Sequence, residues 1–101
     1  RTILSRSALK LGVLAFACVR FGVHTRELSD RFEREIQAIP RIVSCHNISG
    51  SADYLLQVVA KDMDDYGLFM NDVLRTLPGV TSVESMFSMR EVKRDAGLPL
   101  L

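Results

Sequence analysis

A short turn of small residues between two runs of β-forming residues constrains this fold more than any other feature. The runs cover residues 41–49 and 52–60, and Gly50-Ser51 joins them. Glycine adopts positive φ angles at no steric cost, so the two runs are predicted to form a β-hairpin. Asp53 stands at the start of the second run, although aspartate is a poor strand former. It is expected either to cap the turn through nearby backbone N–H groups or to face a ligand.

Before the hairpin, the sequence predicts one strand and one helix. Residues 11–21 carry apolar side chains at both odd and even positions, which is typical of a strand buried on both faces. Thr25 is then a suitable N-cap for a helix in which Leu28, Phe32 and Ile36 recur every fourth residue. The proline at position 40 is expected to end this helix.

After the hairpin, the sequence predicts a second helix and a last strand. Asp62 is a suitable N-cap, and apolar residues at helical spacing continue to Leu77, where a Pro-Gly pair ends the pattern. Asp64 and Asp65 are explained by the positive end of the helix dipole, so they predict no metal site. Residues 80–92 alternate well enough between apolar and polar side chains to form a strand.

The predicted order is therefore strand, helix, strand, strand, helix, strand. Right-handed crossovers place both helices on one face of a four-stranded antiparallel sheet, which defines an α+β, ferredoxin-like βαββαβ sandwich. Residues 11–21 and 54–60 are apolar on both faces, so the face without helices would expose a large apolar patch on a monomer. A second copy of the chain is the simplest cover for that patch, and we expect at least a dimer.

Composition excludes several classes of function. The 101 residues suffice for one domain, and thirteen basic against twelve acidic side chains do not make the strongly basic surface of a nucleic-acid binder. Cys18 and Cys45 are expected to be reduced in a cytoplasmic protein.

The basic start and the apolar run after it imitate a signal peptide, but the run continues as a strand does and is too short to span a membrane. No nucleophile–base pair, metal spacing or phosphate loop is recognised, so no catalytic residues, metal ligands or cofactor are predicted.

Two motifs carry a resemblance to a known family. G-x-x-D-Y-x-L starts at Gly50, and L-P-G-V starts at Leu77. Weaker matches lie in residues 14–20 and in M-x-E-V-K from Met89. Nearly the whole chain is similar to the effector-binding domain of the Lrp/AsnC, or feast/famine, family of prokaryotic transcription regulators.

The resemblance implies a division of the chain and limits its contact with DNA. Residues 1–10 resemble the remnant of an interdomain linker strand, residues 11–93 the effector-binding domain, and residues 94–101 a C-terminal tail. The family's helix-turn-helix is not found in this sequence. DNA binding is therefore expected only through a domain that this chain does not contain.

The resemblance also implies an assembly and a small ligand. Dimers form by packing two sheets together, and dimers assemble further into tetramers or octamers. A small effector, usually an amino acid, binds between subunits near the turn. The residues assigned to the ligand by this resemblance are Ser49, Gly50, Asp53, Tyr54, Met63, Ser85 and Met86. In chemical terms, the backbone N–H groups of Gly50 and Ser51 would receive a carboxylate, and Asp53 an ammonium group.

The sensing domain of a regulator, rather than an enzyme, is the predicted function, and two other classes stay open at this point. The same strand order supports small dimeric oxygenases and haem-precursor decarboxylases, in which His46 or Tyr54 would have to act. A ligand-free oligomerisation module is the third class. Simple packing also explains Tyr54, and His46 is expected to be a partly buried, hydrogen-bonded histidine on a sheet face.

Overall fold

The order of elements is the one that the sequence predicts. The computed structural model describes residues 12–93 and 97–100. Its elements are β1 (Val13–Phe21), α2 (Arg26–Ile36), β2 (Ile42–Asn47), β3 (Tyr54–Ala60), α3 (Met63–Asp72), the short 3-10 helix η1 (Leu74–Thr76) and β4 (Val80–Phe87). The predicted linker strand at residues 1–10 and part of the predicted tail lie outside the described residues.

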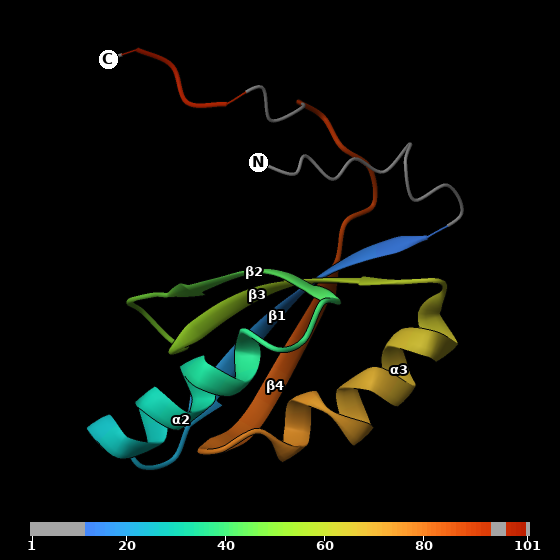
Figure 1. The fold of residues 1–101 in the computed structure, drawn as a ribbon. Coiled ribbons are helices and arrows are strands. Elements are labelled where there is room, and N and C mark those ends of the chain that lie inside the picture. Colours follow the sequence, from blue (N-terminus) through green and yellow to red (C-terminus); the bar gives the residue numbers. More distant parts are fainter. Residues whose placement is uncertain (1–11, 94–96, 101) are drawn as a thin grey trace.

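The four strands form one antiparallel sheet with the order β2-β3-β1-β4. Strands β2 and β3, which are consecutive in the chain, pair with each other. Strand β1 pairs with β3 on one side and with β4 on the other. Both helices lie on one face of this sheet, below it in Figure 1. The predicted βαββαβ sandwich is therefore confirmed, with β2 and β4 as its two edges.

Both predicted N-caps are present. The hydroxyl oxygen of Thr25 accepts a hydrogen bond from the backbone N–H of Leu28 (3.2 Å) at the start of α2. The Oδ1 atom of Asp62 accepts one from the backbone N–H of Asp65 (2.8 Å) at the start of α3. Each bond satisfies a donor that the first helical turn cannot pair internally, which is why both helices begin where they do.

The second helix and the last strand are both shorter than predicted. The α-helix ends at Asp72, and η1 continues it as a tighter turn in which the Thr76 hydroxyl donates to the carbonyl oxygen of Val73 (2.8 Å). Such a side-chain bond to a nearby carbonyl competes with the regular helical pattern. Strand β4 ends at Phe87, because its partner Ala15 lies close to the start of β1 and residues beyond 89 would pass the end of that strand.

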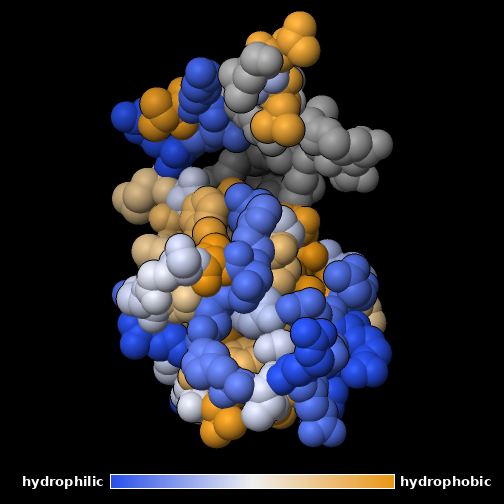
Figure 2. Space-filling model, turned by 90° about the vertical axis from the view of Figure 1, so that its left-hand side faces the viewer, coloured by the Kyte–Doolittle hydropathy of each residue, from blue (hydrophilic) through white to orange (hydrophobic). Residues whose placement is uncertain are grey.

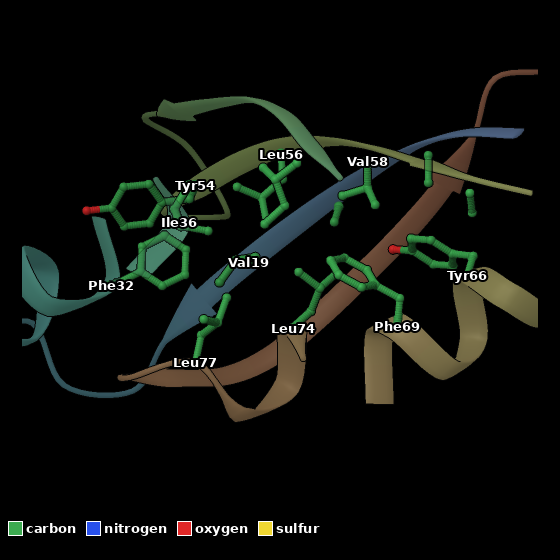
Figure 3. Close-up of a cluster of buried hydrophobic side chains, with 14 of the residues drawn as sticks. Val19, Phe32, Ile36, Tyr54, Leu56, Val58, Tyr66, Phe69, Leu74 and Leu77 are labelled. Carbon is green, nitrogen blue, oxygen red and sulfur yellow. The ribbon is translucent and has the colours of Figure 1, made fainter. Parts of the chain in front are cut away.

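The core lies between the sheet and the two helices. Val19, Leu56 and Val58 from the sheet are fully buried, as are Phe32 from α2 and Leu74 from η1. Figure 3 shows these side chains pointing into the space between the layers. Burial of this kind, at about 25 cal/mol per Å² of apolar surface, is the main force that holds the helices on the sheet.

The other face of the sheet carries no helix. In β1, Ala15, Ala17 and Val19 face the helices and are 0% exposed, whereas the side chains between them are only partly buried. We call this second surface the open face. The register places on it Leu14, Phe16, Cys18, Leu55, Gln57, Val59 and Met86. The predicted apolar face without a helical cover is thus present in the described part of the chain.

Candidate functional site

The turn between β2 and β3 is exposed and open to approach. Gly50 has a φ angle of 111°, and a Cβ atom built there would meet no described atom within 4 Å. Ser49, Gly50 and Ser51 are all exposed. The turn is closed by two hydrogen bonds to the carbonyl oxygen of Asp53, from the backbone N–H of Ile48 (3.0 Å) and from Nδ2 of Asn47 (2.9 Å). The predicted positive φ angle is confirmed, and backbone groups of the turn lie within reach of a ligand.

Figure 2 views the molecule from the end that carries this turn and the start of α2. Hydrophilic side chains cover much of this end, with apolar side chains interspersed. A ligand at the turn would therefore approach a mixed, mainly polar surface rather than an apolar patch.

Asp53 connects the turn to the end of β1. Its Oδ2 atom accepts a hydrogen bond from the backbone N–H of Phe21 (2.8 Å), and its own N–H donates to the carbonyl oxygen of Val19 (2.9 Å). Its Oδ1 atom lies 3.6 Å from Nδ1 of His24, and the side chain is 28% exposed. The carboxylate therefore does not cap its own turn. Its Oδ2 atom is bonded to β1, whereas its Oδ1 atom lies next to the exposed side chain of His24.

Tyr54 belongs to the core rather than to the surface of the turn. It is 3% exposed, and its ring packs against those of Phe32 and Phe21, with centroid distances of 4.5 and 5.5 Å. Its hydroxyl donates a hydrogen bond to Oε2 of Glu33 (2.5 Å). Burial, together with this bond to a carboxylate, raises the pKa of Tyr54 to about 12. Its ring is thus part of the core that lies next to the turn.

The other three predicted ligand residues are not near the turn within one chain. Met63 is 53% exposed at the start of α3, and strand β3 separates it from the turn, so that the two lie at opposite ends of the sheet (Figure 1). Ser85 faces α3, where its hydroxyl shares a hydrogen bond with that of Tyr66 (2.7 Å). Met86 is 46% exposed on the open face, opposite Phe16. One subunit therefore brings together only the residues of the turn.

His46 differs from the prediction. It is exposed, on the edge strand β2 opposite Leu55, instead of partly buried and hydrogen-bonded. The reason is that an edge strand leaves the side of its last residues open to solvent. The described residues contain no group of three or more His, Cys, Asp or Glu side chains placed to hold a metal ion. Among the same residues, no helix combines the length and the apolar character needed to cross a membrane.

A groove that the sequence did not indicate lies between α2 and β2. Its volume is about 150 Å³, and its walls are formed by Glu33, Ile36, Gln37, Cys45, Asn47 and Tyr54. Burial raises the pKa of the Cys45 thiol to about 11, and the negative charge of Glu33 adds to the shift. Glu33 belongs to the polar side of a helix, and such residues are ordinarily solvated, so no sequence pattern singles it out.

The four-stranded sheet with two helices on one face defines a small α+β domain, and an exposed glycine turn lies at one end of it. Comparison with known proteins specifies the class. The Lrp/AsnC ligand binding domain family matches residues 14–98 of the chain. The chain therefore belongs to this family, whose domains bind effectors in transcription regulators, and the sequence-based identification is confirmed.

Individual relatives agree with this assignment. The chain is 32% identical over 99 residues to the transcriptional regulator AzlB of Bacillus subtilis. The matched region covers 98% of this chain and 63% of that protein. It is 33% identical over 97 residues to the Bkd operon transcriptional regulator of Pseudomonas aeruginosa, covering 96% and 63% of the two chains. A transcriptional regulator of Neisseria meningitidis, solved as a complex with L-methionine, superimposes with a TM-score of 0.86 at 30% identity over 98% of this chain and 64% of that one.

These three relatives are transcription regulators, so the enzyme alternative receives no support from them. The chain spans about 63% of the length of the two curated relatives.

Proposed function

We propose that this chain is the effector-sensing and oligomerisation part of an Lrp/AsnC-type regulator and binds a small amino-acid-like ligand at the turn. The observation that carries this proposal is the exposed Gly50 turn beside the Asp53 carboxylate. Open backbone N–H groups of Gly50 and Ser51 suit a carboxylate, and Oδ1 of Asp53 suits an ammonium group. An α-amino acid carries both charged groups on one carbon atom.

The complex of the meningococcal regulator with L-methionine supports an amino acid as the class of ligand. Met63 and Met86 are exposed apolar side chains that would suit an apolar ligand side chain. Since both lie away from the turn of their own subunit, they would reach the ligand from a neighbouring subunit, and the site would be complete only in the oligomer.

The open face supports the assembly. Its apolar side chains extend across the two central strands, and a patch of this kind on a monomer is normally covered. Packing of two open faces would give a dimer, and dimers would assemble further around the ligand sites. Contact with DNA would require a domain outside this chain, and a regulator of this type would act in the cytoplasm of a prokaryote.

Titration calorimetry with the twenty common amino acids, beginning with L-methionine, tests the proposal. Asp53→Asn removes the charge but keeps an oxygen that can accept from the Phe21 N–H, and Asp72→Asn, at an exposed position at the other end of α3 from Met63, is the matched control. We expect Asp53→Asn to weaken binding about ten- to a hundredfold, because a charge-assisted bond contributes about 1.5–3 kcal/mol.

The control variant should bind like the wild type. If none of the amino acids binds, the proposal of an amino-acid effector is wrong. If Asp53→Asn binds as tightly as the wild type, the ammonium group is held elsewhere and the assigned site is wrong.

A further inference from the structure

We propose that the groove between α2 and β2 is a second binding site, which takes the ammonium group of a small organic amine. It is lined by Glu33 of α2 and its C-cap Gln37, by Cys45 and Asn47 of β2 and by Tyr54. This groove lies on the helix side of the sheet, and none of the other residues predicted to hold the effector lines it. The inference does not depend on where the effector binds.

Two side chains of the groove are fixed by hydrogen bonds that leave one oxygen of each available. Oε2 of Glu33 accepts the hydroxyl of the buried Tyr54 (2.5 Å), and Nδ2 of Asn47 donates to the carbonyl oxygen of Asp53 (2.9 Å). Oε1 of Glu33 and Oδ1 of Asn47 have no hydrogen-bond partner among the described residues. An exposed glutamate is usually free to rotate, whereas this one is held in place, so little entropy is lost when it binds a cation.

The chemistry of the lining selects the class of ligand. A carboxylate and two carboxamides offer acceptor oxygens, and none of the described residues that line the groove is Lys, Arg or His. An anion would therefore meet repulsion, while an ammonium group has three donors for such acceptors. The Ile36 side chain supplies an apolar wall for a short hydrocarbon stem.

Size limits the ligand further. The groove holds about 150 Å³, which corresponds to the room of about five water molecules at about 30 Å³ each. This is well below the roughly 300–1,000 Å³ of sites for drug-sized ligands. A primary amine with a stem of three to five carbon atoms, about six non-hydrogen atoms in all, fits this room.

Cys45 provides a reporter within the groove. Its thiol is half-buried, and both burial and the charge of Glu33 disfavour the thiolate that reacts with alkylating reagents. A bound ammonium group would lie between Glu33 and the solvent and would cover the thiol. Cys18 lies on the opposite, open face, which the proposed dimer covers, so the reference for Cys45 is its own labelling rate without the amine.

The first experiment is titration of the folded chain with n-butylammonium chloride, followed by backbone amide chemical shifts, with n-butanol as the uncharged control. We expect saturable shifts at β2 and at the end of α2 with the amine only. Glu33→Gln can still accept from Tyr54 and should raise the dissociation constant about tenfold. Glu35→Gln, on the same helix but outside the groove, should leave it unchanged. Gln37→Glu adds a second carboxylate and should tighten binding.

The second experiment measures iodoacetamide labelling of each cysteine by mass spectrometry. The amine should change the labelling rate of Cys45, because it covers the thiol and neutralises Glu33, whereas n-butanol should leave the rate unchanged, and Glu33→Gln should remove the effect of the amine. Equal shifts with butanol, or equal affinity of Glu33→Gln and the wild type, would overturn the proposal.

The ammonium group could also belong to a lysine of a second copy of the chain. In that case Glu33→Gln would reduce the oligomeric state in sedimentation, and free amine would do the same. A free amine as the natural ligand predicts no change of mass in either arm.

Discussion

Asp53 continues the hydrogen bonding between β1 and β3 one step beyond the start of β3. Its N–H donates to the carbonyl oxygen of Val19 (2.9 Å), and its carboxylate accepts from the N–H of Phe21 (2.8 Å), where a continued β3 would offer a backbone carbonyl. The sheet is irregular at this point, since the pairing of β1 with β4 shifts between Arg20 and Phe21. A carboxylate at position 53 therefore extends the hydrogen bonding between β1 and β3 by one step, while its other oxygen lies near the turn.

Replacement of Asp53 by alanine should destabilise the fold. The N–H of Phe21 would lose its acceptor, and an unpaired, partly buried donor costs about 1–3 kcal/mol. The Asp53→Asn variant retains an acceptor and should lose about 1 kcal/mol or less. Urea denaturation followed by circular dichroism measures both. Equal midpoints for Asp53→Ala and the wild type would show that the bond to Phe21 adds nothing to stability.

Local features of this fold follow from the sequence, and non-local ones do not. The caps Thr25 and Asp62 bond to N–H groups three residues along the chain, so their roles can be recognised from spacing alone. The partner of Asp53 is 32 residues away, and Tyr54 and Glu33 are 21 residues apart. No periodicity encodes such pairs, because they depend on how elements meet in three dimensions.

The candidate site shows the same limit. The turn around Gly50 could be predicted, since a positive φ angle has a residue signature. The positions of Met63, Ser85 and Met86 at three separate places could not, since a motif states which residues matter but not which subunit supplies them. His46 was expected to be partly buried, and its exposure follows from the edge position of β2, which only the strand order reveals.

Two glycines should respond in opposite directions to alanine. Gly79 has a φ angle of 81°, and a Cβ there would lie 2.8 Å from Cε2 of Phe21, so Gly79→Ala should cost about 2 kcal/mol or more. Gly67 is inside α3, and a built Cβ there meets nothing within 4 Å beyond its chain neighbours and the backbone of its own helix, so Gly67→Ala should add about 0.5–1 kcal/mol of stability. Thermal unfolding of both variants, compared with the wild type, measures the difference. A stabilised Gly79→Ala would contradict the close packing of Phe21 on this turn.

Stability should fall at acid pH through Asp65. The backbone N–H of Lys61, followed by the Arg41 guanidinium, lowers the pKa of Asp65 below its usual value of 3.8. A carboxylate with a lowered pKa in the fold stabilises the protein at pH values above the unfolded pKa, and this contribution is lost as the pH falls through the folded value. The free energy of unfolding, measured from pH 7 down to pH 2, should therefore fall more steeply for the wild type than for Asp65→Asn.

Arg41→Met is the companion variant, because Arg41 also lies over the ring of Phe69, 4.7 Å from its centroid. If Asp65→Asn and the wild type lose stability in parallel, other carboxylates govern the acid response. A smaller acid effect in Arg41→Met than in the wild type is expected, since the guanidinium is the second source of the lowered pKa.

The open face should hold two copies of the chain together. Phe16 lies at its centre, between Gln57 of β3 and Met86 of β4. Burial of this apolar surface favours association, so the chain should sediment as a dimer or larger at micromolar concentration. Phe16→Asp places a charge in the interface, and such a charge cannot be buried unpaired without a cost of several kcal/mol. This variant should therefore sediment as a monomer with an unchanged circular dichroism spectrum.

Leu68→Asp, at a 64% exposed position on α3, is the control and should remain oligomeric. A monomeric wild type, or an oligomeric Phe16→Asp, would show that the open face is not the surface through which the subunits associate.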